Sequence, residues 1–309
     1  MAINSQIEKS AELERLLAGG GSIGVDTITS LLESDDEDLG LLASYLLAGR
    51  EEQILPRIAA GPGPLLRRLA RRHGAELLRR LDLPERLRAA ILAEQDAEEP
   101  ARALPAAMPG ERSATMTIVV HGAFAAGDSW WRPTGVFGRY IHSMTGNLYQ
   151  GSDYYRWSGG GFHPARVEAA RQLVEWVRLH PADELDIISH SHGGNICFLA
   201  TQMGIKVRKL ISLATPICLD YLPDLRQIGI LHNVLSLADI IQGPASYIGV
   251  SHRGDGRSLA DSKRVINHLA TLDDDGHAPS HSELHDPATW KASGLEAKLL
   301  GPGSFPPKK

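Results

Sequence analysis

The stretch Leu185-Asp-Ile-Ile-Ser-His-Ser-His-Gly-Gly-Asn-Ile-Cys-Phe-Leu-Ala200 decides the fold that we expect for this chain. Ile187 and Ile188 are β-branched and apolar, which is typical of a parallel strand that is covered on both faces. A glycine follows at Gly193, and the apolar residues of 196–199 form the buried side of a helix. The stretch therefore predicts a buried strand, a sharp turn and a helix in direct succession.

The predicted turn carries the pattern small-x-Ser-x-Gly, written out as Ser189-His190-Ser191-His192-Gly193. A turn of this kind forces its middle residue, Ser191, into a strained backbone, so that the hydroxyl projects above the sheet. Small residues are needed two places before and two places after this serine, because strand and helix nearly touch there. Ser189 replaces the first glycine of the related pattern G-x-S-x-G and is small enough to fit. The pattern predicts Ser191 as a nucleophile.

This strand–turn–helix unit resembles the nucleophile elbow of the α/β-hydrolase superfamily, on its lipase and esterase side. The resemblance covers residues 114 to 290 and leaves the N-terminal third unexplained. It implies a three-layer α/β fold with a mainly parallel sheet. It also implies a serine hydrolase whose acid and base follow the serine in the chain order Ser, Asp or Glu, His.

Segments with strand composition recur on both sides of the elbow. Besides the elbow strand, the expected strands are Thr115–Gly122, Asn147–Tyr155, Lys209–Thr215, Asn233–Asp239 and Arg264–Thr271, and the expected helices are Gly135–Ser143 and Ala165–Leu179. Strands that alternate with helices imply a mainly parallel sheet that is covered on both sides.

A serine hydroxyl is a poor nucleophile at neutral pH and needs a base and an orienting acid. Asp239 ends a predicted strand and matches the position of the acid in the resembled family. Asp220, after the preceding strand, is the alternative, because a minority of lipases place the acid there.

The base is expected in the loop after the last predicted strand. His281 begins a predicted helix there, as the base does in lipase-like proteins, and it completes the order Ser191, Asp239, His281. His277 and His285 are the competing residues.

The same histidines raise the question of a metal site. His277, His281 and His285 are four residues apart, and Asp273–Asp275 precede them. However, Glu283 is one place away from the zinc-peptidase pattern H-E-x-x-H, and no calcium-loop spacing is present. We therefore expect neither a metal nor a cofactor.

An acyl transfer also needs hydrogen-bond donors for the oxyanion that develops on the substrate. We expect the amide of His192, next to the nucleophile, and the amide of Ala123, in the loop after the first strand, to supply them. Aromatic residues are concentrated after that strand, and Phe124, Trp130 and Trp131 are the candidates for the wall of an apolar acyl pocket.

The composition is that of an ordinary globular protein: 309 residues, 43% hydrophobic and 22% charged, with a formal net charge of -5. The absence of a basic surplus argues against nucleic acid as a partner. No apolar run reaches the length of a membrane span, and the first residues lack the layout of a signal peptide. A cytoplasmic location is therefore expected, with signal-independent export left open. Cys197 and Cys218 are expected to be buried free thiols.

We expect the chain to divide into four parts: a helical module (1–98), a proline-rich linker (99–113), the α/β-hydrolase domain (114–300) and a tail (301–309). In the helical module, an acidic run at Glu33–Asp38 and arginines between Arg67 and Arg80 form either two solvated helix faces or a docking surface for a protein partner.

Taken together, these patterns favour a serine esterase acting on a lipid or another apolar ester. A peptidase or an acyltransferase of the same fold is the first alternative, because the three catalytic residue types do not distinguish these reactions. A catalytically inactive hydrolase that serves as a binding module is the second.

Overall fold

The computed structural model describes residues 115–160, 163–242, 256–260, 262–272, 278–301 and 304, and of Asp220 only the backbone. The predicted helical module 1–98, the linker 99–113 and most of the tail 301–309 lie outside these ranges. No helix in the described ranges is both long enough and apolar enough to cross a bilayer.

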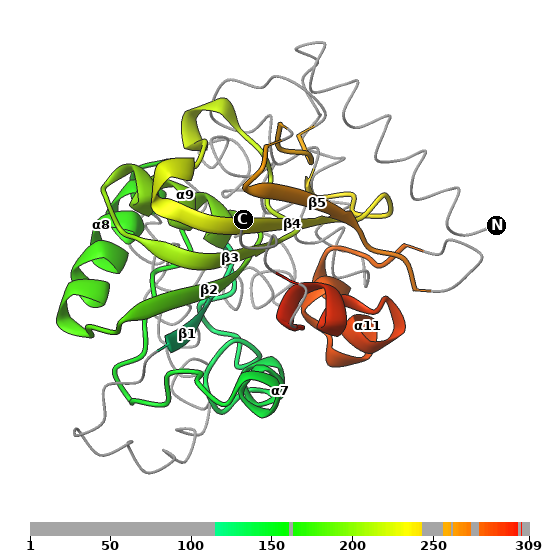
Figure 1. Cartoon of the computed structure of the whole chain (residues 1–309), viewed down its shortest axis with the longest axis horizontal. Helices are drawn as coiled ribbons and strands as arrows, with labels where there is room; N and C mark the ends of the chain where they lie inside the picture. The colour runs from blue at the N-terminus through cyan, green and yellow to red at the C-terminus, as the bar shows by residue number, and fades with distance from the viewer. Residues whose placement is uncertain are drawn as a thin grey trace, which may run out of the picture.

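The described residues form an α/β fold around one sheet of five parallel strands (Figure 1). The strands are β1 (Thr115–Val120), β2 (Glu184–His190), β3 (Val207–Leu213), β4 (Ile228–Leu235) and β5 (Val265–Leu269). They lie side by side in chain order, and every neighbouring pair is parallel. The predicted parallel sheet is confirmed, although β4 begins five residues before the predicted Asn233 and ends at Leu235 instead of Asp239.

Helices cover both faces of this sheet (Figure 1). Helices α8 (His163–Leu179) and α9 (His192–Gln202) pack on one face, and α7 (Val136–Thr145) and α11 (Pro287–Ala292) lie on the other. Short turns of 3-10 helix are η1 (Leu219–Tyr221), η2 (Leu225–Gln227) and η3 (Ser282–His285), and a π-helical turn, η4, spans Glu296–Leu300.

Each face has its own apolar core. The first core includes Ile187 of β2 and Phe198 of α9, and the second includes Ile188 of β2 and Trp290 of α11. Adjacent residues of β2 thus enter opposite cores, as the period of two along a strand requires. The two cysteines are buried free thiols, as expected.

The strand predicted at Asn147–Tyr155 is reduced to a single parallel bridge between Thr117 and Leu148. The amide of Thr117 donates to Asn147 O and the amide of Tyr149 donates to Thr117 O, each at 2.9 Å. Pairing then stops because 151–153 is Gly-Ser-Asp, which turns the chain away from the sheet. The turn residues override the β-propensity of the neighbouring tyrosines.

This bridge locates a reversal in the path of the chain. The bridge at Leu148 occupies one side of β1, and β2 occupies the other. After β1 the chain therefore moves outward on one side and returns on the opposite side. In open α/β sheets, ligands bind beyond the carboxyl ends of the strands at such a point, and here that point lies between β1 and β2.

The face of the sheet that carries α11 also holds a buried polar group, Lys209 of β3. Its Nζ donates to Leu299 O at 3.0 Å and to Ser304 Oγ at 2.7 Å. Nearby, Nε2 of His232 donates to Ser304 O at 2.8 Å. Ser304, although part of the predicted tail, is therefore anchored on the sheet.

Candidate active site

Ser191 occupies the turn between β2 and α9 and has an unusual backbone conformation, with φ 54° and ψ −135°. A residue other than glycine adopts such angles only where its surroundings compel it. Here the amide of Ser191 donates to Leu213 O at 2.8 Å, and its carbonyl accepts from Gly194 N at 2.9 Å. The turn is thus held from both sides, by β3 and by the first turn of α9.

Close packing around this turn explains its small residues. A Cβ on Gly193 would lie 2.5 Å from the carbonyl oxygens of Val120 and His121, and a Cβ on Gly122 would lie 2.8 Å from Ser191 Cβ. The loop after β1 therefore touches the turn directly. The hydroxyl of Ser189 is accommodated because it donates to Ile211 O at 3.2 Å.

Backbone strain gathers at this edge of the sheet. In the described part of the chain, the residues other than glycine with positive φ are Phe124 (64°), Ser191 (54°) and Ala214 (51°). They follow the carboxyl ends of β1, β2 and β3 respectively. Strained backbone of this kind clusters at functional sites, because its cost of about 1–3 kcal/mol per residue must be met by the surrounding structure.

Asp239 and His281 are brought together at the same edge. Nδ1 of His281 lies 2.8 Å from Oδ2 of Asp239, and both side chains are fully buried. The other carboxylate oxygen, Oδ1, accepts from the amides of Ile241 and Gln242, each at 2.8 Å. The carboxylate is therefore fixed by three hydrogen bonds and fixes the imidazole in turn.

His281 lies against His190, the residue before Ser191. Its ring is 4.6 Å, between centroids, from the ring of His190, and its backbone carbonyl accepts from His190 Nε2 at 3.0 Å. Burial lowers the pKa of His192, the residue after Ser191, and the charges of Arg166 and His281 lower it further. His281 precedes η3, in agreement with the helix predicted to begin there.

The other histidines at this edge are held neutral by burial. Burial lowers the pKa of His121 to about 4 and that of His285 to about 3. It is also the main cause of the lowered pKa of His190 and His192, which lie well below the usual value. The site is thus lined by uncharged rings. In such buried surroundings, electrostatic interactions are stronger than in water.

The predicted oxyanion donors lie on the two loops that meet at Ser191. His192 is the first residue of α9, so its amide belongs to the positive end of an eleven-residue helix. Ala123 is buried in the loop after β1, one residue beyond Gly122. The chain therefore carries backbone donors on both sides of the turn.

The three aromatic residues predicted to wall a substrate pocket have different environments. Phe124 belongs to the core under α8 and α9. Trp131 is buried: its indole packs 4.3 Å from the ring of His121, and its Nε1 donates to Ala125 O. Trp130 is partly buried and stacks on His285 at 3.8 Å between centroids, with the two ring planes nearly parallel, at 2° to each other.

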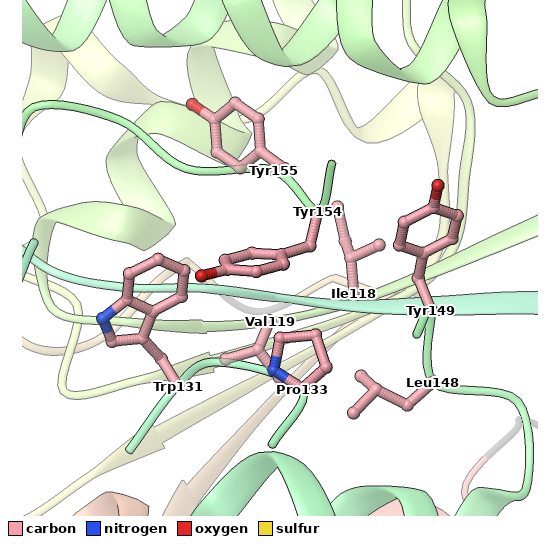
Figure 2. Close-up of a pocket in the computed structure, with 8 residues that line it drawn as sticks. All are labelled: Ile118, Val119, Trp131, Pro133, Leu148, Tyr149, Tyr154 and Tyr155. Carbon is pink, nitrogen blue, oxygen red and sulfur yellow. The ribbon is translucent and has the colours of Figure 1, made fainter. Parts of the chain in front are cut away.

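Figure 2 shows a cavity lined by Trp131, together with Ile118, Val119, Pro133, Leu148 and three tyrosines. It lies on the side of β1 that forms the bridge with Leu148. Its volume of ≈ 10 Å³ is that needed by a single water molecule. An acyl chain does not fit there, so the predicted role of Trp131 in substrate binding gains no support from this cavity.

The alternative candidates for the acid and the base are Asp220, His277 and His285. The side chain of Asp220 and the whole of His277 lie outside the described ranges. His285 packs against Trp130 instead of a carboxylate. Within the described ranges no three His, Cys, Asp or Glu side chains are grouped to hold a metal ion, while the predicted aspartates 273–275 lie outside them.

Sequence patterns did not single out His190. It is the first variable position of the small-x-Ser-x-Gly pattern, so its identity is not part of the signal. In the structure it lies between the turn and the loop that carries His281. A histidine directly before the predicted nucleophile was the available clue.

Comparisons with known proteins add little to this description. No protein-family model matches the chain, and no curated protein matches it. Among solved structures, the crystal structure of Aspergillus fumigatus lipase B is similar, with a TM-score of 0.36 and 14% sequence identity, over 92% of this chain and 90% of that one. A likeness at this TM-score does not carry the activity of that lipase to this chain.

Proposed function

We propose that this protein is a serine hydrolase that cleaves a carboxylic ester through an acyl-enzyme. Ser191 is the nucleophile, His281 the general base and Asp239 the acid that orients it. The proposal rests on one observation above all: a fully buried carboxylate and imidazole, 2.8 Å apart, of which the imidazole contacts His190, the residue before a serine with φ 54°. Such a pair orients a base, and such a serine presents a nucleophile.

The hydrogen bond to Asp239 decides the tautomer of His281. A carboxylate only accepts, so Nδ1 of His281 carries the proton and Nε2 keeps its lone pair. Nε2 then takes the proton of Ser191 Oγ as the hydroxyl attacks the ester carbonyl. The imidazolium that forms is stabilised by the carboxylate of Asp239, and it protonates the leaving alcohol.

The oxyanion of the tetrahedral intermediate needs donors that are already oriented. The amides of His192 and Ala123 take this role, and the positive end of α9 adds to the favourable field. In the second half of the reaction His281 removes a proton from water, which attacks the acyl-enzyme. The acid is released and the hydroxyl of Ser191 is restored.

The surroundings of His281 favour an uncharged, apolar ester as the substrate. His190, His192 and His285 are neutral, and the indole of Trp130 lies over His285. These rings themselves carry no charge to compensate an ionic substrate, and the nearby charge that acts on His192 is that of the buried Arg166. A lipid or another ester of low polarity is therefore the substrate class that we propose.

A fluorophosphonate probe and a chain-length series of p-nitrophenyl esters test this function. The wild-type protein is expected to label and to hydrolyse, with a preference among acyl lengths. Ser191→Ala should abolish both, whereas the matched variant Ser189→Ala, two residues earlier, should keep both. Labelling that persists in Ser191→Ala, or that is lost in Ser189→Ala alone, would contradict the assignment.

A further inference from the structure

We propose that His190 is a positioning residue, which holds the catalytic base by its backbone and couples the loop of His281 to the turn of Ser191. This inference rests on the proposed function of those two residues. It assigns to His190 no contact with the substrate and no proton transfer.

The first support is a hydrogen bond to the backbone of the base. Nε2 of His190 lies 3.0 Å from His281 O. A carbonyl can only accept, so Nε2 is the protonated nitrogen of His190. The two imidazoles also meet edge to face, with centroids 4.6 Å apart and planes at 62°. His190 therefore contacts both the backbone and the ring of His281.

The second support is the position of His190 itself. It is the last residue of β2, in register with Leu213 of β3, and only 5% of it is exposed. The next residue is Ser191. The end of β2 thus carries both the proposed nucleophile and the side chain that binds the backbone of the proposed base. If this strand end shifts, both groups shift together, so their relative position is kept.

The third support is a set of rings that fix the orientation of His190. Its ring lies edge-on to His285, at 4.8 Å, and to Trp130, at 5.5 Å. Those two rings stack on each other at 3.8 Å. Trp130 comes from the loop after β1 and His285 from η3, so two separate segments converge on His190.

The electrostatic state of His190 suits this role. Burial lowers its pKa well below the usual value, and a charge on His281 lowers it further. His190 therefore stays neutral while His281 becomes an imidazolium during the reaction. A second cation within 5 Å would oppose that step, since like charges in a buried site repel strongly.

The catalytic consequence follows from geometry. His281 stands before a short 3-10 turn whose start has one local side-chain bond, from Ser280 N to Glu283 Oε2 at 2.7 Å, while the carbonyl of His281 is bound by His190. A displacement of about 1 Å in a catalytic group costs roughly 100-fold in rate. Loss of the anchor should therefore lower kcat and leave KM nearly unchanged.

Two variants of similar shape separate the hydrogen bond from packing. His190→Gln places an amide N–H at the position of Nε2, whereas His190→Met fills similar space without a donor. In the full-length chain, we expect His190→Met to lower kcat by roughly 10- to 100-fold with KM within about 2-fold. His190→Gln should recover kcat to within about 3-fold of the wild type. Labelling of Ser191 by the fluorophosphonate should slow in parallel with kcat.

The outcomes are distinguishable. Equal losses in His190→Gln and His190→Met, or wild-type kcat in both, would overturn the role of this hydrogen bond. If His190→Met does not fold, His190→Asn replaces it, because its shorter amide does not reach His281 O. A wild-type protein that neither labels nor hydrolyses overturns the proposed function and this inference together, whereas an active wild type with an unaffected His190→Met overturns the inference alone.

Discussion

The two ends of the sheet are built on different principles. At the amino ends of the strands, Nε of Arg208 donates to Asp186 at 2.8 Å and lies 3.1 Å from the carboxylate of Glu184. In these ion pairs Arg208 and Glu184 keep partial access to solvent, whereas Asp186 is buried. At the carboxyl ends, ionisable groups are buried, several histidines are neutral, and the backbone is strained at Phe124 and Ser191.

A hollow at the amino end sharpens the contrast. It measures ≈ 470 Å³ and is lined by the starts of β2, β3 and β4, with Arg208 among its charged residues. It is far roomier than the cavity beside Trp131, yet it contains no strained backbone, and Arg208 already has acidic partners. Within the described ranges, the strained residues other than glycine lie at the end of the sheet where we propose the catalytic site, and not at the end with the larger hollow.

The largest expected loss of kcat comes from replacing the proposed acid or base at the carboxyl end of the sheet. Asp239→Asn and His281→Ala should each lower kcat by roughly a thousandfold or more, because the imidazole loses its orientation or is absent. Asp186→Asn, at the amino end, is the matched control and should leave kcat unchanged. Steady-state kinetics on a p-nitrophenyl ester measure all three, and a comparable loss in Asp186→Asn would remove the distinction between the two ends.

The next largest effect is expected from substituting alanine for either of two glycines, one at each end of the sheet. A Cβ on Gly193 would lie 2.5 Å from two carbonyl oxygens, and a Cβ on Gly229 would lie 2.4 Å from Arg208 O. Alanine at either position should destabilise the fold by about 2–4 kcal/mol, since backbone must move.

Only one of the two substitutions should damage activity directly. Gly193→Ala displaces the loop after β1 relative to Ser191, so the folded fraction should also lose kcat. Gly229→Ala should retain the kcat of the wild type per folded molecule. Urea unfolding and active-site titration, carried out together, separate the two effects, and equal kcat values would show that the turn tolerates the displacement.

The free energy of unfolding should fall at acidic pH, because histidines that are buried and neutral must then be protonated. The folded-state pKa of His121 is about 4, below its unfolded value of 6.5, so the unfolded chain binds more protons between these values. Stability is therefore complete above about pH 6.5 and is lost as the pH falls towards 4. A shift of this size corresponds to about 3 kcal/mol for one histidine.

Urea unfolding at pH 7.5, 5.5 and 4.5 measures this loss. His121→Gln removes one of the titrating groups, so its stability should fall less steeply over the same pH window. An unchanged slope in that variant would show that His121 is protonated in the folded protein.

The smallest effect concerns the strain itself. Ser191→Gly removes the side chain that makes φ 54° unfavourable and should stabilise the fold by about 1 kcal/mol while abolishing activity. Ser189→Gly is the comparison: it lies inside β2 in extended backbone, where glycine should destabilise. Thermal unfolding of both variants tests whether strain is concentrated at the turn or shared by the whole strand end.

Features of the fold and of the site that depend on neighbouring residues could be predicted from the sequence, whereas contacts between residues far apart in the chain could not. The parallel sheet followed from short apolar segments, and the strained backbone of Ser191 followed from its immediate neighbours in small-x-Ser-x-Gly. The expected strand at Asn147–Tyr155 was wrong beyond Leu148, because the turn formed by 151–153 was given too little weight. That error was local and could have been corrected from the sequence.

Interactions across long separations could not be predicted in the same way. The contact between Asp239 and His281 spans 42 residues and was proposed only because of a family resemblance in chain order. The bond from His190 to His281 spans 91 residues and has no counterpart in any local pattern. The burial of Lys209 depends on acceptors close to the end of the described chain.

The burial of Lys209 has a consequence for how the chain folds during its synthesis. Because the strands pair in chain order, each one finds its neighbour soon after it leaves the ribosome. The ammonium of Lys209, in contrast, waits for two acceptors that are synthesised 90 and 95 residues later. Until these acceptors are present, water takes their place around the ammonium, since a buried charge that lacks hydrogen bonds is costly. The segment that carries Leu299 and Ser304 is therefore the one that removes water from Lys209 on this face of the sheet, and a nascent chain that stops before Leu299 leaves that ammonium hydrated.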